Sequence, residues 1–361
     1  MSTNGDRVLV AMSGGVDSSV AAALLRERGE DVVGVFLRTG AHSGSDAPGA
    51  ERRCCSATDA ADAAAVAERL SIPFYALDYA REFSRVMDDF AAEYAAGRTP
   101  NPCVRCNQWV KFGSLFDLAD RVGARRVATG HYARIGGAPG RLRLRDARDA
   151  RKNQVYFLFT LGQRELERAE FPVGGMTKDE VRAEAARLEL PVQAKPESQE
   201  ICFVPDGDHA AVVEARRPGA MADGPVLDLA GREVGRHDGL PRYTVGQRRG
   251  LSIPFGERRY VVRLDVARNA VIVGGPEDLR VEEIRVRDVR WADASAPPAG
   301  TEVRARVQIR YRHPAGAASI RVAGDGVADV RFDEPESGVS PGQAAVFFDG
   351  DEVLGGGWIA S

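Results

Sequence analysis

The stretch that decides the fold of this chain is Val8-Leu9-Val10-Ala11-Met12-Ser13-Gly14-Gly15-Val16-Asp17-Ser18-Ser19. Its apolar first half predicts a buried parallel strand. A Ser-Gly-Gly turn follows, and a helix is predicted from Asp17 to about Arg28, with Gly29 closing it. Backbone N–H groups at such a turn, backed by a helix N-terminus, favour an anion such as a phosphate. No Gly-Lys-Ser/Thr follows, so the turn is not a Walker loop.

The pattern Ser-Gly-Gly-x-Asp-Ser after a first strand resembles the PP-loop of ATP pyrophosphatases. Enzymes of that class hold the pyrophosphate of ATP and transfer AMP. The alternative is an ordinary glycine-rich turn between a strand and a helix. Because all five fixed residues match directly after the first strand, the phosphate loop is favoured.

Strands and helices alternate through the first part of the chain. Further strands are predicted at 32–37, 73–78 and 126–129, and helices at 59–70, 82–96, 112–122 and 177–188. This alternation predicts an α/β fold with a doubly wound parallel sheet. Ligands of such sheets bind at the carboxyl ends of strands, so we expect Ser13, Leu37 and the Gly130-His131 pair to converge on one pocket.

The texture changes after residue 205, where long helical patterns stop and short strands with Gly and Pro turns begin. Asp349-Gly350 between two apolar runs is typical of a hairpin. We therefore predict three domains: a catalytic domain over 1–210, a small β-rich domain over 211–284 and a β-barrel-like domain over 285–361.

Composition narrows the class of protein. Hydrophobic residues make up 44% and charged residues 28%, which is typical of a globular chain. No apolar run approaches the roughly 20 residues of a membrane span, and the N-terminus lacks the pattern of a signal peptide. We expect a cytoplasmic protein with no membrane partner. The net charge of −3 excludes polyanion binding over the whole surface, so any nucleic-acid surface must be local.

Two basic runs are candidates for such a local surface. Residues 301–321 and residues 141–152 each carry a net charge of +4. In the strand predicted over 303–312, arginines alternate with apolar residues, so one face is basic. The alternatives are a solvated strand face and a polar loop. Two such runs in a chain of negative net charge favour a phosphate track.

The cysteines are Cys54, Cys55, Cys103, Cys106 and Cys202. An odd number favours catalytic or metal roles over a disulfide framework. Cys103 and Cys106 form a Cys-x-x-Cys loop leading into a helix, and Arg105 beside it favours the reactive thiolate. A zinc site is less favoured because this is the only such pair. Cys202 alone could equally be a small buried hydrophobe.

Taken together, these motifs resemble the tRNA-specific 2-thiouridylases of the MnmA type over nearly the whole chain. The matching stretches are Ala11 to Ser18, Thr99 to Asn107, Ala128 to Tyr132, Ser198 to Phe203, Tyr243 to Leu251 and Pro341 to Phe347.

The resemblance implies a set of site residues. Cys106 matches the family's catalytic nucleophile and Cys202 its persulfide-bearing cysteine. ATP, with Mg²⁺, would be held by Ala11, Met12, Ser13, Gly14, Gly15, Val16, Asp17, Ser18, Leu37 and Gly130. The segment next to the target base would be Asn101, Pro102 and Cys103. Other tRNA contacts would be His131, Lys152, Asn153, Gln154, Arg310, Tyr311 and Gln343.

The implied activity is ATP-dependent 2-thiolation of the wobble uridine in a tRNA anticodon, forming AMP and pyrophosphate. The C2 oxygen is adenylated, a cysteine persulfide supplies sulfur, and a Cys106–Cys202 disulfide results. The base must leave its stack to react, which suits an anticodon loop. The implied partners are glutamate, glutamine and lysine tRNAs, together with a persulfide donor such as a cysteine desulfurase or a sulfur relay protein.

Alternatives stay open. Some family members have Asp where this chain has Cys103. With Cys106 and Cys202 it makes three thiols, enough for an iron–sulfur cluster. The chain could also be another PP-loop adenylating ligase or amidase, or a non-catalytic RNA-binding protein that carries a metal or cluster. Release of AMP and pyrophosphate that depends on tRNA separates these hypotheses.

Overall fold

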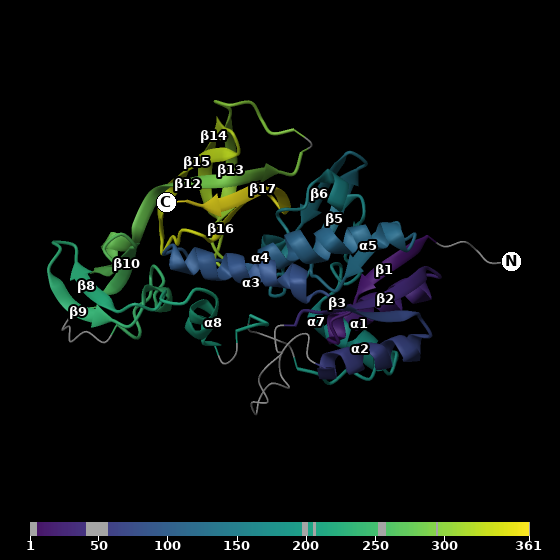
Figure 1. Cartoon of the computed structure of the whole chain (residues 1–361). Helices are drawn as coiled ribbons and strands as arrows, with labels where there is room; N and C mark the ends of the chain where they lie inside the picture. The colour runs from purple at the N-terminus through teal and green to yellow at the C-terminus, as the bar shows by residue number, and fades with distance from the viewer. Residues whose placement is uncertain are drawn as a thin grey trace.

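The computed structural model describes residues 6–40, 57–196, 201–204, 207–251, 258–293 and 295–360. Cys54 and Cys55 lie outside these residues. Among the described residues, strands form sheets of five, four and eight members (Figure 1). No described helix is long and apolar enough to cross a membrane.

The first sheet is parallel throughout, with the order β3-β2-β1-β4-β7. Its strands are β1 (Arg7–Ala11), β2 (Asp31–Arg38), β3 (Phe74–Asp78), β4 (Arg126–Thr129) and β7 (Ala169–Glu170). The helices of this part are α1 (Val16–Glu27), α2 (Ala57–Leu70), α3 (Ala80–Ala95), α4 (Pro102–Arg105), α5 (Leu115–Arg121), α6 (Gln163–Leu166) and α7 (Lys178–Arg187). The predicted doubly wound sheet is confirmed, and its two-residue strand β7 was not predicted.

Burial on both faces explains why β1 is a continuous apolar run. Leu9 packs into one hydrophobic cluster with α5, whereas Val8 and Val10 pack into another with α1, α2 and α7. All three side chains are fully buried. Figure 1 shows α1, α2 and α7 on one side of the sheet and α5 on the other. A parallel strand covered on both faces needs apolar residues at every position.

The helix predicted over 112–122 is different in the structure. A nine-residue π-helix, Cys106–Ser114, follows α4 directly and continues into α5. The predicted helix is confirmed over Leu115–Arg121, whereas the π-helix before it was not predicted, because i→i+5 turns shift the apolar residues out of the 3.6-residue period. Such π-turns occur frequently at functional sites, and this one begins at Cys106.

The middle part of the chain forms the four-stranded sheet, ordered β10-β11-β8-β9. Its strands are β8 (Gly224–Asp228), β9 (Glu233–His237), β10 (Tyr260–Asp265) and β11 (Ala270–Gly274). Helix α8 (His209–Arg216) precedes it. Short 3₁₀ turns occur at Val155–Phe157, Leu240–Arg242 and Glu277–Leu279.

The C-terminal strands close into a six-stranded barrel, because β12 pairs with both β15 and β17. The strands are β12 (Arg280–Trp291), β13 (Glu302–Gln308), β14 (Gly316–Gly324), β15 (Val327–Ser337), β16 (Ala344–Asp349) and β17 (Glu352–Ile359). The predicted hairpin at Asp349-Gly350 joins β16 and β17. The domain boundary expected between 284 and 285 falls inside β12, so we propose a boundary before Arg280.

The polar loop that was one alternative for the basic run over 141–152 is present only in its second part, over residues 146–152. Residues Arg141–Arg145 form strand β6, which pairs with β5 (Arg134–Ala138) and joins the barrel sheet at β17. The first part of the chain therefore supplies a hairpin to the C-terminal sheet.

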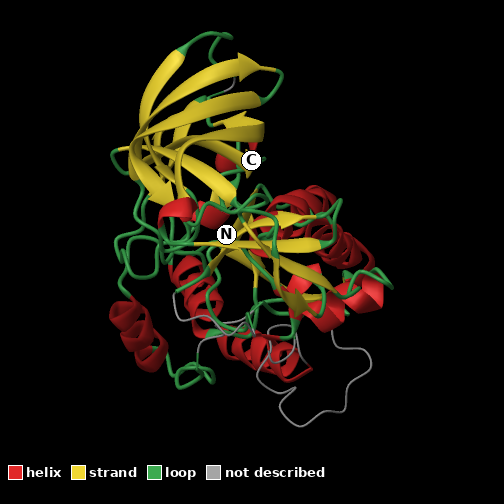
Figure 2. Ribbon diagram, turned by 90° about the vertical axis from the view of Figure 1, so that its left-hand side faces the viewer, coloured by secondary structure: helices red, strands yellow, loops and turns green. Residues whose placement is uncertain are grey.

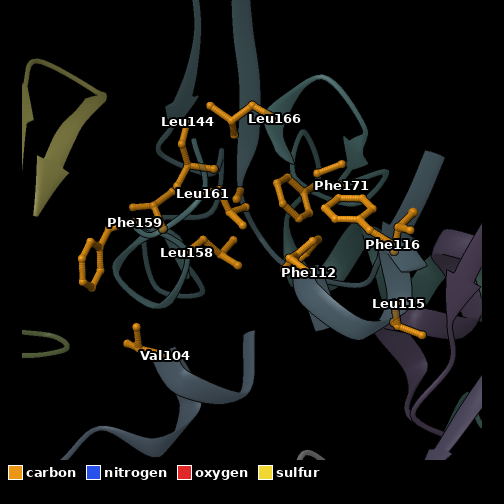
Figure 3. Packing of buried hydrophobic residues seen from close by; sticks show 14 of the residues in the cluster. Val104, Phe112, Leu115, Phe116, Leu144, Leu158, Phe159, Leu161, Leu166 and Phe171 are labelled. Carbon is orange, nitrogen blue, oxygen red and sulfur yellow. The ribbon is translucent and has the colours of Figure 1, made fainter. Parts of the chain in front are cut away.

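One large hydrophobic cluster joins the first domain to the barrel. It contains Val104 of α4, Phe112 and Phe116 beside Phe171, and Trp358 of β17 (Figure 3). Figure 2 shows the barrel stacked against the helices and strands of the first domain. Because α4 packs at this junction, the position of the Cys-x-x-Cys segment depends on both domains.

Candidate functional site

The turn between β1 and α1 is held by its own hydroxyl groups. Ser18 Oγ accepts from the Ser13 backbone N–H at 3.1 Å and donates to the Gly15 carbonyl at 3.1 Å. Ser19 Oγ donates to the same carbonyl at 2.9 Å. Ser13 is exposed, whereas Ser18 and Ser19 are buried. The two buried hydroxyls thus hold the turn from its protein side, and the exposed side at Ser13 stays accessible to a ligand.

Two glycines permit close backbone approach at this turn. Gly14 has φ +72°, and a Cβ there would lie 2.2 Å from the Asp59 carbonyl oxygen. Gly130 follows β4, and a Cβ there would lie 2.5 Å from the Ser18 backbone nitrogen. Neither position can carry a side chain without moving backbone. The structure therefore brings Gly130 against the phosphate loop, as expected from the carboxyl ends of β1 and β4.

Asp17, in the first turn of α1, accepts two hydrogen bonds on one oxygen. Tyr132 Oη donates to Asp17 Oδ1 at 2.8 Å, and Lys178 Nζ donates to it at 2.6 Å. The Lys178 side chain is only 7% exposed, whereas that of Asp17 is 31% exposed. The carboxylate thus lies between a buried ammonium and the open side of the loop.

The structure places Cys106 and Cys202 against one hydrophobic cluster, although 96 residues separate them in sequence. The cluster contains Phe83, Phe90 and Phe203. Cys106 also packs against a second, smaller cluster together with Leu37, a predicted ATP contact at the end of β2. Cys106 therefore contributes to both clusters, one shared with Cys202 and one shared with Leu37.

The three thiols of the predicted cluster site do not share one environment. Cys103 is exposed, while Cys106 and Cys202 are partly buried. Among the described residues, no group of three or more His, Cys, Asp or Glu side chains is arranged to hold a metal. This arrangement does not fit an iron–sulfur cluster, and no step is derived through one.

Asp17 does suit a magnesium–nucleotide complex. Mg²⁺ in nucleotide sites uses one or two carboxylates and completes its shell with phosphate oxygens and water. Asp17 Oδ1 is hydrogen-bonded, and Oδ2 has no partner among the described residues. That oxygen could ligate a cation held at the same time by phosphates on the loop.

The Cys-x-x-Cys segment is fixed by backbone and aromatic contacts. Asn101 Oδ1 caps α4 by accepting from the Val104 backbone N–H at 3.4 Å. The Arg105 guanidinium lies 4.0 Å from the Trp358 ring centroid and 4.9 Å from that of Trp109. Burial lowers the pKa of Arg105, while Asp89, 3.4 Å away, opposes that effect. Arg105, the residue directly before Cys106, thus contacts Trp358 of the barrel.

Three predicted tRNA residues lie around Tyr132, next to Asp17. Gln154 Oε1 accepts from the Tyr132 backbone N–H at 2.8 Å, and Asn153 donates to Asp146 at 2.6 Å. His131 is 8% exposed and its Nδ1 lies 2.7 Å from Thr129 Oγ1. Burial, with the Lys111 charge second, lowers the pKa of His131 well below its ordinary value, so the ring is neutral at pH 7. Each of these three side chains has a structural partner in the chain.

The barrel supplies the remaining predicted contacts. Gln343 Nε2 donates to the Thr99 carbonyl at 2.9 Å, which holds the loop before Asn101. The Tyr311 ring packs at an angle of 45° against that of Phe157, with ring centroids 4.4 Å apart, and Arg310 is exposed. The structure therefore brings Gln343 to the Asn101-Pro102-Cys103 segment and Tyr311 to the turn after Gln154.

Most arginines of the two basic runs have carboxylate partners. In the first run Arg143, Arg145, Arg148 and Arg151 pair with Asp293, Glu352, Glu180 and Asp149. In the second run Arg304 makes a two-pronged contact with Asp333, at 2.9 and 2.6 Å. Arg306 differs: it donates to the Gly350 carbonyl and makes no ion pair with a described residue. The strand also ends at Gln308, short of the predicted residue 312.

Sequence reasoning missed Lys178 and Tyr132 as partners of Asp17. It named Arg105 only as a neighbour of the reactive cysteines and missed its contact with Trp358 of the barrel. The sequence predicts a helix over 177–188 from a Thr-x-x-Glu capping box at Thr177 and Glu180, and the structure confirms both the box and the helix. Nothing in that signal marks Lys178, the next residue after Thr177, as part of a site. Its side chain meets Asp17 across 161 residues of chain. Only the parallel packing of α7 beside α1 brings the pair together, and a single sequence carries no signal of that contact.

The fold and the loop together define an ATP-using enzyme of the PP-loop class. The family model described as "tRNA methyl transferase HUP domain" matches residues 6–206. Those described as "tRNA methyl transferase PRC-barrel domain" and "Aminomethyltransferase beta-barrel domain" match 214–275 and 281–359.

Curated relatives of high sequence identity show the family to which the chain belongs. A tRNA-specific 2-thiouridylase MnmA from Geobacter metallireducens is 51% identical over 98% of this chain and 96% of its own length. One from Chloroflexus aggregans is 51% identical over 98% of both chains. The chain belongs to the tRNA-specific 2-thiouridylase family. Among solved structures, the chain is similar to one described as a predicted subunit of tRNA methyltransferase from Methanocaldococcus jannaschii. The match is 21% identical, covers 50% of this chain and 76% of that chain, and has a TM-score of 0.32.

Proposed function

We propose that this protein is an ATP-dependent tRNA-uridine 2-sulfurtransferase, which adenylates the C2 oxygen of the wobble uridine and replaces it with sulfur. The observation that carries the proposal is the placement of Cys106. Cys106 packs against the hydrophobic cluster that Cys202 also packs against. It packs as well against a second cluster, which it shares with Leu37 at the end of β2. A plain adenylating ligase would not need a second cysteine beside the first, and a non-catalytic RNA-binding protein would not need the phosphate loop.

In the adenylation step, the C2 oxygen forms a bond to the α-phosphorus of ATP. The bond between the α- and β-phosphates breaks, pyrophosphate leaves with the electron pair, and the uracil N3 proton is released. Residues 11–18 with Gly130 would bind the phosphates through backbone N–H groups, which stabilise the charge that develops on pyrophosphate. Mg²⁺ ligated by Asp17 would supply further positive charge there.

In the sulfur-transfer step, the terminal sulfur of a persulfide on Cys202 bonds to C2, and AMP leaves with the electrons of the carbon–oxygen bond. The Cys106 thiolate then attacks the inner sulfur, and the electrons of the broken S–S bond stay on the C2-bound sulfur. N3 regains a proton, and a Cys106–Cys202 disulfide remains, which a thiol reductant must reduce. The shared hydrophobic cluster supports this pairing because it places both thiols in the same part of the fold. To form the disulfide, their Cα atoms must come within roughly 7 Å.

The substrates and the location follow from the same chemistry. We propose glutamate, glutamine and lysine tRNAs as acceptors and a persulfide-bearing protein, such as a cysteine desulfurase or a sulfur relay protein, as the donor. Cys103 is the exposed thiol of the three and would lie beside the target base. A cytoplasmic location suits these partners.

The test of the proposal is tRNA-dependent formation of AMP and pyrophosphate, followed by mass spectrometry of the nucleosides. Transcribed lysine tRNA and a persulfide donor should yield 2-thiouridine together with both products. An anticodon stem-loop with cytidine at the wobble position is the matched control and should yield neither. AMP formation that ignores tRNA, or thiolation of another base, would contradict the proposal.

Among the basic strand's arginines, Arg306 should matter most for tRNA binding. Arg306→Ala should weaken binding and reduce the slope of log affinity against log salt by up to about one unit, as expected when one phosphate contact is lost. Arg304→Ala is the matched control, because Asp333 already compensates its charge. Filter binding between 50 and 200 mM salt, a range over which such contacts weaken measurably, checks both. An unchanged slope for Arg306→Ala would show that this face is only solvated.

A further inference from the structure

His313, in the turn between β13 and β14, lies between a carboxylate and an arginine. Its Nε2 lies 2.8 Å from Glu336 Oε2, and its Nδ1 lies 3.3 Å from Arg310 Nη2. An arginine carries only donors, so Nδ1 is the acceptor, and the ring proton is on Nε2, which donates it to the carboxylate. The contact with Arg310 therefore requires a neutral imidazole in one defined tautomer.

The backbone around His313 holds the ring in this place. The His313 N–H donates to the Arg310 carbonyl at 3.2 Å, and Gln308 Nε2 donates to the His313 carbonyl at 3.0 Å. Arg312, inside this turn, has φ +62°, a left-handed conformation that a residue with a side chain keeps only where its surroundings impose it. The side chains of His313 and Glu336 are only 20% and 14% exposed. The imidazole is thus a fixed support for Arg310.

Arg310 itself remains available for an anionic ligand. It is exposed, and its guanidinium contacts the His313 ring and, at 3.4 Å, the Gly338 carbonyl. Among the residues that the structure describes, it has no carboxylate partner. Arg304 differs, because Asp333 already binds its guanidinium in a two-pronged contact. A guanidinium offers five N–H groups, so Arg310 keeps donors for a bidentate contact with an oxyanion.

The surroundings of Arg310 indicate which oxyanion this is. The hydroxyl of the buried Tyr156 donates to the Ala344 carbonyl at 3.1 Å. Burial raises the pKa of this hydroxyl, whereas hydrogen bonds with Ala344 and Asn101 and the charge of Arg310 oppose that rise. The guanidinium therefore lies within electrostatic reach of the Asn101 segment, which we propose to lie beside the target base. The anionic groups that an RNA presents around a base are its backbone phosphates.

We propose that His313 is a positioning residue, which is held by Glu336 and orients the Arg310 guanidinium toward a backbone phosphate of the tRNA near the target uridine. The inference rests on the proposed function, which supplies the RNA. The Glu336 carboxylate keeps the ring proton on Nε2 and so leaves Nδ1 as the acceptor that Arg310 needs. A phosphate contact of this kind sets the register of the RNA and carries no base specificity.

The experiment is filter binding of transcribed lysine tRNA to the full chain at several salt concentrations. His313→Ala should weaken binding about fivefold, the scale of one hydrogen bond, and lower the salt slope by up to about one unit. His313→Gln is the matched control, because its amide keeps an acceptor and a donor, and its affinity should stay within about twofold of wild type. His313→Phe retains a ring without an acceptor and should reproduce the alanine loss, so it carries the test if the alanine variant fails to fold.

A double-mutant cycle distinguishes positioning of Arg310 from general support of the barrel. In the Arg310→Ala background, His313→Ala should cause no further loss, because the side chain that it positions is gone. In the Arg306→Ala background the loss of about fivefold should persist, since Arg306 contacts the Gly350 carbonyl instead. Equal losses in both backgrounds, or unchanged binding by His313→Ala, would overturn the proposal. The proposed function is tested separately, by the products that the wild-type chain forms with tRNA.

Discussion

Replacing Cys202 with Ser should abolish 2-thiolation while tRNA-dependent pyrophosphate release continues. A serine hydroxyl cannot carry a persulfide, whereas the phosphate loop lies in a different part of the chain and keeps its geometry. Cys106→Ser should have the same outcome, because its thiolate is needed to release sulfur from the carrier. Nucleoside mass spectrometry and a pyrophosphate assay on the same reactions measure the two steps separately.

Cys103→Ser is the control that tells the thiols apart. Cys103 is exposed and lies outside the cluster that Cys106 and Cys202 share, so partial thiolation should survive its loss. Complete loss would instead favour a three-thiol cluster. Cys54→Ser and Cys55→Ser should be nearly silent. Retained thiolation in Cys202→Ser, with a protein persulfide donor rather than excess sulfide, would refute the two-cysteine mechanism.

The second large effect is expected at Asp17. Asp17→Asn should lower the rate of pyrophosphate formation by about a hundredfold or more, the scale on which lost charge stabilisation in a transition state is felt. Asparagine keeps an oxygen for Tyr132 and Lys178, so the fold should survive. Affinity for tRNA should stay within a few-fold of wild type, since Asp17 belongs to the nucleotide end. Pre-steady-state pyrophosphate release and filter binding check the two parts.

Asp17→Ala should show the same catalytic loss together with a loss of stability. It removes the Asp17 carboxylate from the buried Lys178 ammonium, which should cost up to about 3 kcal/mol. The Asn and Ala variants therefore distinguish catalysis from stability. Unchanged ATP consumption in both variants would remove Asp17 from the phosphate site.

The alternation of strands and helices could be predicted from the sequence, because a parallel strand covered on both faces must be apolar throughout. Val8, Leu9 and Val10 of β1 are an example, since all three are fully buried. The start of the helix at Thr177 was also predictable, because the capping-box signal lies within four residues. The PP-loop was recognisable because the backbone conformation of the turn requires glycine, as the positive φ of Gly14 shows. The hairpin at Asp349-Gly350 was found for the same reason.

Local sequence does not reveal contacts between residues that lie far apart in the chain. The π-helix at Cys106 breaks the period on which helix prediction rests. Arg143 and Arg304, one from each basic run, pair with the distant carboxylates of Asp293 and Asp333. The Asp17–Lys178 pair and the Arg105–Trp358 contact depend on how α7 and the barrel pack. The sequence by itself determined the parallel sheet, the phosphate loop and the candidate cysteines, because each is recognised from a short stretch of neighbouring residues. Tertiary structure alone decided which charges are compensated and which residues join Asp17, because packing sets those distances.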